Sequence, residues 1–384
     1  MTAILTPRRL LSTFVTGLLL ASLPLQAGTP LPAPPQIAGD SHILVDHQTG
    51  KVLVERNADN QVEPASITKI MTAYVVFKQL EGGTLSLDDE VLVSEKAWRA
   101  PGSRMFIEVD KKIPVEDLLK GMIIQSGNDA SIALAEFVAG SEDSFADLMN
   151  QYAAQLGMSN SNFRNATGLP SDGHLVTARD IAILVRAMIA EFPEYYRWYS
   201  QREYTWNEIT QGNRNLLLYR DDRVDGVKTG HTDAAGYCLA ASAVQDDMRL
   251  ISVVMGTGSE KSRADASQAL LNYGFRFFET HKLYAAGDAI TEARVWKGPL
   301  DTIGLMPQQD IFITIPRGRY DELEAVMDLK SQLMAPLAAG EIVGVVRISL
   351  DGEELVTAPL VPAAPVPEGS LFRVIVDSVK LLFE

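Results

Sequence analysis

Cysteine is almost absent from this sequence. The 384 residues include one thiol, at Cys238. No intramolecular disulfide can form, so packing alone must hold the fold together. The thiol is either a catalytic nucleophile or a structural side chain. It lies in the largely apolar stretch 237–240, which favours a buried structural thiol.

Positive charge is also scarce. The chain has 34 Lys and Arg against 49 Asp and Glu, a formal net charge of -15. Phosphate binding needs clustered basic side chains, so we expect no nucleic-acid partner. Histidine is rare and shows neither His-x-His nor His-Glu-x-x-His spacing, so we expect no metal and no other cofactor. The five histidines are His42, His47, His174, His231 and His281.

Long apolar runs are missing except at the start of the chain. Arg8 and Arg9 precede an apolar run over residues 10–23, and Ala27 offers a small residue for cleavage. This order predicts a secretory signal over residues 1–27, and hence an exported protein. A retained membrane helix is the alternative, although the run is short for a bilayer core.

The remaining sequence indicates a globular chain with room for two domains, because 46% of it is hydrophobic and 22% charged. Residues 28–40 are rich in proline and predict an extended lead-in. Residues 41–282 predict an α/β (α+β) domain, with a sheet built from both ends of the segment and helices between. Its expected hairpins span 43–54 and 237–255, and its expected helices span 65–80, 115–122, 129–139, 144–156, 178–190 and 262–278.

Short strand-like runs dominate the next part of the chain, at 311–315, 325–327 and 343–348. They predict a smaller β-rich domain over residues 283–368. Residues 369–384 predict a helix with one narrow polar stripe, formed by Arg373, Asp377, Lys380 and Glu384. Such a helix could lie in a membrane surface with its apolar face down, or pack on its own protein. The proline-rich spacer at 362–367 favours the membrane.

Three short motifs could carry chemistry. Ser66 and Lys69 stand three residues apart at the start of an expected helix, so their side chains share one face. A partly desolvated lysine loses its proton more easily and can serve as base toward a hydroxyl. Taken alone, however, most Ser-x-x-Lys matches are solvated helix faces.

The other two motifs are equally weak by themselves. Ser126-Gly127-Asn128 lies in an expected loop between two helices, where it could relay a proton or simply cap the helix that follows. Lys228-Thr229-Gly230 precedes an expected strand. Its lysine and threonine could hold a carboxylate, and its glycine lets a ligand backbone approach a strand edge. The alternative is an ordinary turn with a surface lysine.

In this order, the three motifs resemble the signature of penicillin-binding proteins and serine β-lactamases. The stretches 64–69, 226–232 and 273–278 are similar to the low-molecular-weight D-alanyl-D-alanine carboxypeptidases, and the resemblance covers nearly the whole chain. It implies a transpeptidase-type fold with a second small β-rich domain and a C-terminal amphipathic helix. It also implies removal of the terminal D-Ala from peptidoglycan pentapeptide stems, covalent inhibition by β-lactams, and a place on the periplasmic face of the inner membrane.

The resemblance also assigns the nucleophile and its helpers. Ser66 would be acylated, with Lys69 as its base, and Ser126 would complete the proton relay. Asn128 would contact the substrate. These roles come from the family motifs rather than from spacing alone.

A second set of residues would line the opposite wall. Lys228, Thr229 and Gly230 would lie there, with His231 beside them. The backbone N–H groups of Ser66 and His231 would form an oxyanion hole. Arg263 matches the family arginine that helps to hold the substrate's terminal carboxylate, and Arg214 falls where the family has another arginine in the cleft.

Alternative functions remain open at this point. A serine β-lactamase would need a group that activates the deacylating water, and no acidic loop suited to that stands out. A D,D-endopeptidase is poorly separated by sequence. A non-catalytic peptidoglycan-binding protein is the third alternative, disfavoured by the intact Ser66, Lys69 and Lys228.

Overall fold

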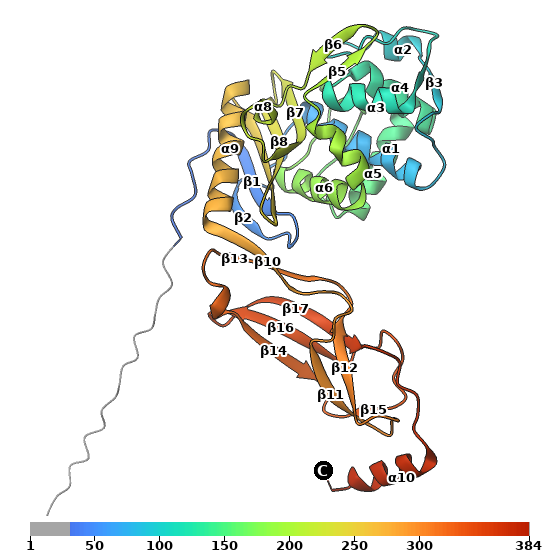
Figure 1. Ribbon diagram of the computed structural model, residues 1–384. Helices are drawn as coiled ribbons and strands as arrows, with labels where there is room; N and C mark the ends of the chain where they lie inside the picture. The colour runs from blue at the N-terminus through green and yellow to red at the C-terminus, as the bar shows by residue number, and fades with distance from the viewer. Residues whose placement is uncertain (1–30, 384) are drawn as a thin grey trace, which may run out of the picture. The chain divides into compact units, whose positions relative to one another are not determined.

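The computed structural model describes residues 31–383 (Figure 1). The expected signal segment, 1–27, lies outside the described residues. Residues 31–38 contain neither helix nor strand before the first sheet begins.

A five-stranded antiparallel sheet organises the first part of the chain, in the order β2-β1-β9-β8-β7. Its strands are β1 (Ser41–Asp46), β2 (Val52–Arg56), β7 (Val224–Thr232), β8 (Gly236–Gln245) and β9 (Met248–Thr257). Both expected hairpins form, and β1 pairs with β9, so the prediction of a sheet built from both ends of the segment is confirmed.

Both faces of this sheet are buried, because successive side chains point to opposite sides. Cys238 and Ala240 belong to the larger core on the helical side, whereas Leu239 and Ala241 belong to the core beneath α9 (Glu260–Phe277). Figure 1 shows α9 along one face and the remaining large helices gathered on the other. Cys238 is fully buried, which agrees with a structural thiol, and burial raises its pKa to about 11.

Two helices of the larger layer, and α9 on the other face, begin at good capping residues. Ser141, Thr177 and Ser259 each accept a hydrogen bond from a backbone N–H of the first turn. Two expected helices therefore begin two residues earlier than predicted. The layer consists of α1 (Lys69–Glu81), α3 (Val115–Ile124), α4 (Asn128–Ala139), α5 (Glu142–Gln155) and α6 (Ala178–Glu191).

Short elements complete this domain and were not predicted. They are β3 (Glu90–Leu92), α2 (Glu95–Trp98), β4 (Lys112–Pro114), α7 (Pro193–Tyr196), η2 (Arg197–Ser200), β5 (Glu203–Trp206), β6 (Ile209–Gly212) and α8 (Leu217–Arg220). Elements of three or four residues carry too little periodic pattern to be recognised from sequence.

The expected single helix over 65–80 is a 3-10 turn, η1 (Ala65–Thr68), followed by α1. Ala65 has a left-handed φ of 46°, so the chain turns sharply just before Ser66. The correction leaves the motif intact, because residues three apart align in a 3-10 turn as well. Ser66 and Lys69 still share one face.

The β-rich part begins directly after α9. Strand β10 (Phe278–Tyr284) pairs with β13 (Ile311–Pro316), so pairing within this part starts five residues before the expected boundary at 283. A six-stranded sheet has the order β14-β16-β17-β12-β11-β15. Its strands are β11 (Thr291–Trp296), β12 (Thr302–Pro307), β14 (Glu324–Leu329), β15 (Leu333–Met334), β16 (Gly344–Leu350) and β17 (Glu353–Pro362), with η3 (Tyr320–Glu322) before β14.

The three expected strand-like runs fall in β13, β14 and β16. Strands β11, β12 and β17 were missed because they are not continuous apolar runs. In β11, for example, Glu292 and Arg294 are exposed between Ala293 and the buried Val295. A sheet with one solvated face has this alternation.

The C-terminal helix, α10 (Leu371–Lys380), is shorter than the expected 369–384. Two residues of its polar stripe, Arg373 and Asp377, contact the β-rich domain. Asp377 is 2% exposed and accepts a hydrogen bond from the backbone N–H of Lys297, and Arg373 pairs with Asp301. The apolar face is solvent-exposed, with Leu371 84% exposed. Within residues 31–383, no helix is long and apolar enough to cross a membrane.

Candidate active site

Ser66 and Lys69 lie where η1 passes into α1, beside the free edge of β7. Ser66 lines a cleft of about 330 Å³, and Lys69 lies behind it with only 1% of its surface exposed. The Lys69 Nζ lies 2.9 Å from Ser66 Oγ. The sequence motif therefore forms a nucleophile and base in direct contact.

Two fixed acceptors orient the Lys69 amine. Its Nζ donates to Asn128 Oδ1 over 2.7 Å and to the backbone carbonyl of Thr167 over 2.6 Å. The Asn128 amide cannot reverse easily, because its Nδ2 donates to the Pro101 carbonyl over 2.6 Å. A neutral amine has two N–H donors and one lone pair. With both donors engaged, the lone pair is left for the Ser66 hydroxyl.

The charge state of Lys69 suits a base. Burial, assisted by the nearby Arg214, lowers the pKa of Lys69 from 10.5 to about 7. The carboxylates of Asp129 and Glu142 oppose this shift. Near neutral pH, a large fraction of Lys69 is therefore unprotonated and able to accept a proton.

Ser126 lies between α3 and α4 and lines the same cleft. Its backbone has a left-handed φ of 64°, which turns the chain sharply between the two helices. The residue before α4 is Gly127, and no side chain caps this helix. The Asn128 side chain therefore contacts Lys69 and does not cap α4, so the alternative of a helix cap is excluded for this residue.

Asp129 holds the neighbouring wall of the cleft. It is 1% exposed, and its carboxylate accepts hydrogen bonds from the backbone N–H groups of Met105, Phe106 and Ile107, at 2.9, 2.8 and 3.2 Å. This clamp fixes the segment that follows Gly102 and Ser103, both of which line the cleft. A single carboxylate therefore ties the start of α4 to the loop opposite.

The opposite wall is the edge strand β7. Thr229, Gly230 and His231 line the cleft, and Lys228 lies behind them, 3% exposed. A Cβ on Gly230 would lie 3.0 Å from the Pro64 carbonyl oxygen and 3.2 Å from the Ala65 Cβ. The glycine thus allows β7 to pack against η1, a requirement that differs from the ligand contact expected from sequence.

Positive charge concentrates around this wall. Burial lowers the pKa of Lys228 well below its usual value, and Lys69, Arg214 and Arg263 add to the effect. Arg263 is itself buried and donates to the Gly230 carbonyl over 3.0 Å. The cleft is lined by the guanidinium groups of Arg214 and Arg263, and Glu260, 3.7 Å from Arg263, is the one carboxylate among its lining residues; this excess of positive charge suits a bound carboxylate.

All ten predicted site residues converge on this cleft. Seven line it directly, namely Ser66, Ser126, Arg214, Thr229, Gly230, His231 and Arg263. Lys69, Asn128 and Lys228 are buried just behind. A larger cavity of about 710 Å³, near Thr49 and Thr314, is lined by none of these ten residues. We therefore assign the active site by the chemistry of its residues and not by cavity volume.

Sequence reasoning missed several contributors. Thr167 acts through its backbone carbonyl, which carries no side-chain signature. Tyr237 and Glu260 also line the cleft, and the ring centroid of Tyr237 is 4.0 Å from that of His231. Across residues 31–383, no group of three or more His, Cys, Asp or Glu side chains could hold a metal ion.

Comparisons with known proteins agree with this geometry. The family described as D-alanyl-D-alanine carboxypeptidase matches residues 29–259, and the penicillin-binding protein 5 C-terminal domain matches residues 278–368. The chain is 43% identical to the D-alanyl-D-alanine carboxypeptidase DacA of Escherichia coli, over 92% of this chain and 90% of the relative. It is 44% identical to DacC of the same organism, over 91% and 89%.

A solved structure extends the likeness to three dimensions. Penicillin-binding protein 5 from Haemophilus influenzae superposes with a TM-score of 0.83 at 42% identity, covering 88% of this chain and all of that one. The expected transpeptidase-type fold with its β-rich second domain is thereby confirmed.

Proposed function

The chain belongs to the D-alanyl-D-alanine carboxypeptidase family and is a serine-type carboxypeptidase, and from that premise we propose how its residues carry out the reaction. The observation that carries the proposal is the buried Lys69 amine, whose Nζ lies 2.9 Å from Ser66 Oγ and within hydrogen-bond distance of Asn128 Oδ1 and the Thr167 carbonyl.

Acylation begins at Ser66. Neutral Lys69 takes the hydroxyl proton while Oγ attacks the carbonyl carbon of the penultimate D-Ala. The backbone N–H groups of Ser66 and His231 stabilise the tetrahedral oxyanion. The peptide bond then breaks, and the leaving amine of the terminal D-Ala receives a proton relayed through Ser126. An ester on Ser66 remains.

Deacylation completes the cycle. A water molecule gives its proton to Lys69 and attacks the ester carbonyl, which releases the shortened stem and restores the Ser66 hydroxyl. A β-lactam carries a similar carboxylate and a strained amide, so its ring opens on Ser66 in the same way. The opened ring has no leaving group that departs, and the adduct persists.

The cationic wall supplies specificity. The terminal carboxylate of the substrate binds among Lys228, Thr229, Arg263 and Arg214, and Asn128 contacts the substrate amide. An internal peptide bond lacks this carboxylate and would lose its contacts with Arg214 and Arg263, at a cost in binding. This favours a carboxypeptidase over an endopeptidase acting on cross-links.

Mass spectrometry of the soluble protein tests these roles. Incubation with diacetyl-L-Lys-D-Ala-D-Ala should release one D-alanine, and penicillin should leave a slowly decaying adduct on Ser66. Rapid penicillin turnover with an untouched peptide would instead indicate a β-lactamase. Release only from cross-linked dimers would indicate an endopeptidase, and no reaction with either compound a binding protein.

Location and domain limits are part of the same proposal. Residues 1–27 direct export, residues 28–40 lead into a catalytic domain at 41–282, and a β-rich domain at 283–368 precedes the anchor at 369–384. The exposed apolar face of α10 lies in the outer surface of the inner membrane. Support comes from Arg373 and Asp377, which contact the β-rich domain, while Leu371, Phe372 and Ile375 are exposed.

A further inference from the structure

The segment that presents the Thr167 carbonyl to Lys69 is a tight, internally bonded loop. Asn165 Oδ1 accepts from the backbone N–H of Thr167 and of Gly168, at 3.1 and 2.7 Å. Asn165 Nδ2 donates to the Leu169 carbonyl over 2.9 Å, and the Leu169 N–H donates to Thr167 Oγ1. The loop therefore moves as one unit, and its position depends on how it is attached.

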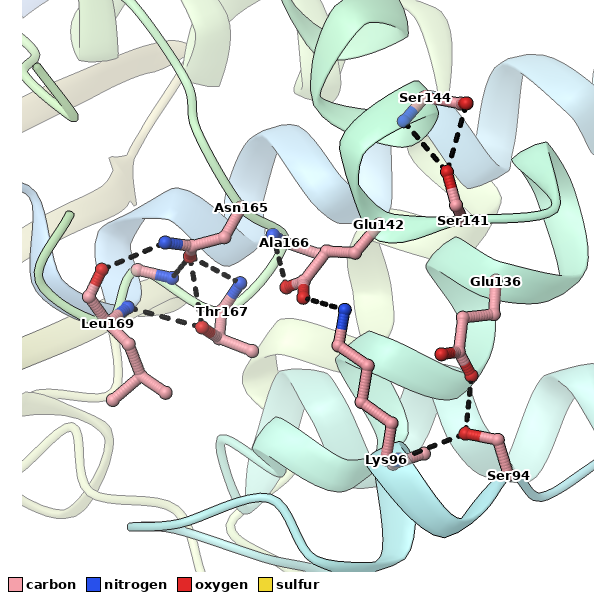
Figure 2. Close-up of polar contacts among 12 residues, drawn as sticks. Ser94, Lys96, Glu136, Ser141, Glu142, Ser144, Asn165, Ala166, Thr167 and Leu169 are labelled. Carbon is pink, nitrogen blue, oxygen red and sulfur yellow. Dashed lines mark hydrogen bonds and ion pairs between the residues drawn. The ribbon is translucent and has the colours of Figure 1, made fainter. Parts of the chain in front are cut away.

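Ala166 is the point of attachment. Its carbonyl accepts from Thr72 Oγ1 on α1 over 2.7 Å, and its N–H donates to Glu142 Oε1 over 3.1 Å. Glu142 is the first residue of α5, and only 11% of its side chain is exposed. One carboxylate oxygen thus holds the residue next to Thr167 (Figure 2).

The second carboxylate oxygen of Glu142 pairs with Lys96 over 2.8 Å. Lys96 lies on α2 with 56% of its side chain exposed, and Figure 2 shows it reaching from that helix across to Glu142. Neighbouring Ser94 donates to Glu136 Oε2 over 2.6 Å, which fixes the start of α2 against α4. The Glu142–Lys96 ion pair therefore connects the loop around Thr167 to α2, and its lysine is accessible to solvent.

We propose that Glu142 is a positioning residue for Lys69: through Ala166 it holds the Thr167 carbonyl against the amine, and its negative charge, moderated by Lys96, favours the protonated form of that amine. The inference rests on the proposed role of Lys69 as base toward Ser66. Neither Glu142 nor Lys96 lines the cleft.

Three charged groups shift the pKa of Lys69 besides its burial. Arg214 disfavours the ammonium form, whereas Asp129 and Glu142 favour it. The neighbouring Lys228 has its own pKa lowered by burial and by Lys69. Asp129 is occupied by three backbone N–H groups. Of the two carboxylates, Glu142 is the one paired with a half-exposed lysine, so its effective charge can be changed without touching the cleft.

Two substitutions should shift the pH dependence of the acylation rate in opposite directions, on the acidic side where the rate falls as Lys69 takes up a proton. Glu142→Gln keeps an oxygen for the Ala166 N–H but removes the charge, so Lys69 should lose its proton at lower pH. Lys96→Met leaves Glu142 unpaired, so Lys69 should hold its proton to higher pH. We expect shifts on the order of half a pH unit each way. The measurement is the second-order rate of penicillin acylation of Ser66 between pH 5 and 9.

Two further variants separate position from charge. Glu142→Ala removes the hydrogen bond as well, and the plateau rate should fall by about tenfold because the Thr167 carbonyl is no longer held. Asp143→Asn removes one negative charge from the adjacent, exposed residue. It should leave unchanged both the pH at which the acylation rate falls and the plateau rate. Thermal melting of each variant identifies any that fail to fold.

The outcomes are distinct. Opposite shifts for Glu142→Gln and Lys96→Met, absent in Asp143→Asn, support the inference. If folded Glu142→Gln and Lys96→Met keep the pH dependence of the unaltered protein, the inference is overturned. It is also overturned if folded Glu142→Ala reaches the same plateau acylation rate as the unaltered protein. Failure of the unaltered chain to acylate at Ser66 would instead reject the proposed function itself.

Discussion

Lys69 shows how burial turns an ordinary side chain into a base. An exposed lysine is protonated at neutral pH, whereas this one has a pKa of about 7 because the folded protein excludes water from it. The carboxypeptidase kcat/KM should therefore fall about tenfold per pH unit below pH 7, as Lys69 takes up a proton. A pH profile from 5 to 9 tests this. A flat profile down to pH 5 would contradict Lys69 as the base.

Ser66 is the residue on which covalent chemistry depends. Ser66→Ala should abolish penicillin labelling while leaving the melting temperature nearly unchanged, because Ser66 only lines the cleft and loses one oxygen. Mass spectrometry after penicillin treatment measures the adduct. Ser171→Ala, at an exposed serine, serves as control and should label fully. Retained labelling of Ser66→Ala would refute the nucleophile assignment.

Among the elements, the loop clamped by Asp129 depends most on a single side chain. Asp129→Ala would leave three backbone N–H groups without their acceptor, so the free energy of unfolding should fall by about 3 kcal/mol. Urea denaturation measures this. Asp147→Ala, an exposed acid on α5, should change it by less than about 0.5 kcal/mol. Equal stabilities for the two variants would show that the clamp is unimportant.

At the scale of the whole molecule, the catalytic and anchoring parts should act independently. Removing residues 370–384 should release the protein from phosphatidylethanolamine–phosphatidylglycerol vesicles, since the exposed apolar face of α10 is lost. Cleavage of a soluble peptide should be unchanged, because α10 contributes nothing to the cleft. Vesicle co-sedimentation and D-alanine release test the two halves of this prediction.

A double variant provides the matched control for that truncation. The substitutions Phe372→Ser and Ile375→Ser together leave the contacts of Arg373 and Asp377 in place but remove apolar surface from the exposed face. It should weaken vesicle binding without altering the docked helix. Sedimentation of the truncated chain at the level of the full chain would reject the interfacial anchor.

Local sequence patterns were enough to predict the longer elements and the main side chains of the site. Local patterns predicted the helices with clear periodicity, the two hairpins of the first sheet and the three motifs, because each pattern lies within a few neighbouring residues. Elements of three or four residues, and strands with one solvated face such as β11, escaped because their patterns are short or polar.

How those residues act depends on contacts that form when distant segments fold together. The Thr167 carbonyl has no side-chain signature, and it reaches Lys69 across 98 positions of sequence. The pKa of Lys69 depends on burial and on Arg214, Asp129 and Glu142, which distant segments bring together. Likewise, the stripe on α10 was visible in the sequence, but its contacts through Arg373 and Asp377 depend on partners in the β-rich domain. Long-range contacts and desolvation arise only when the chain is folded, which is why local patterns could not predict them.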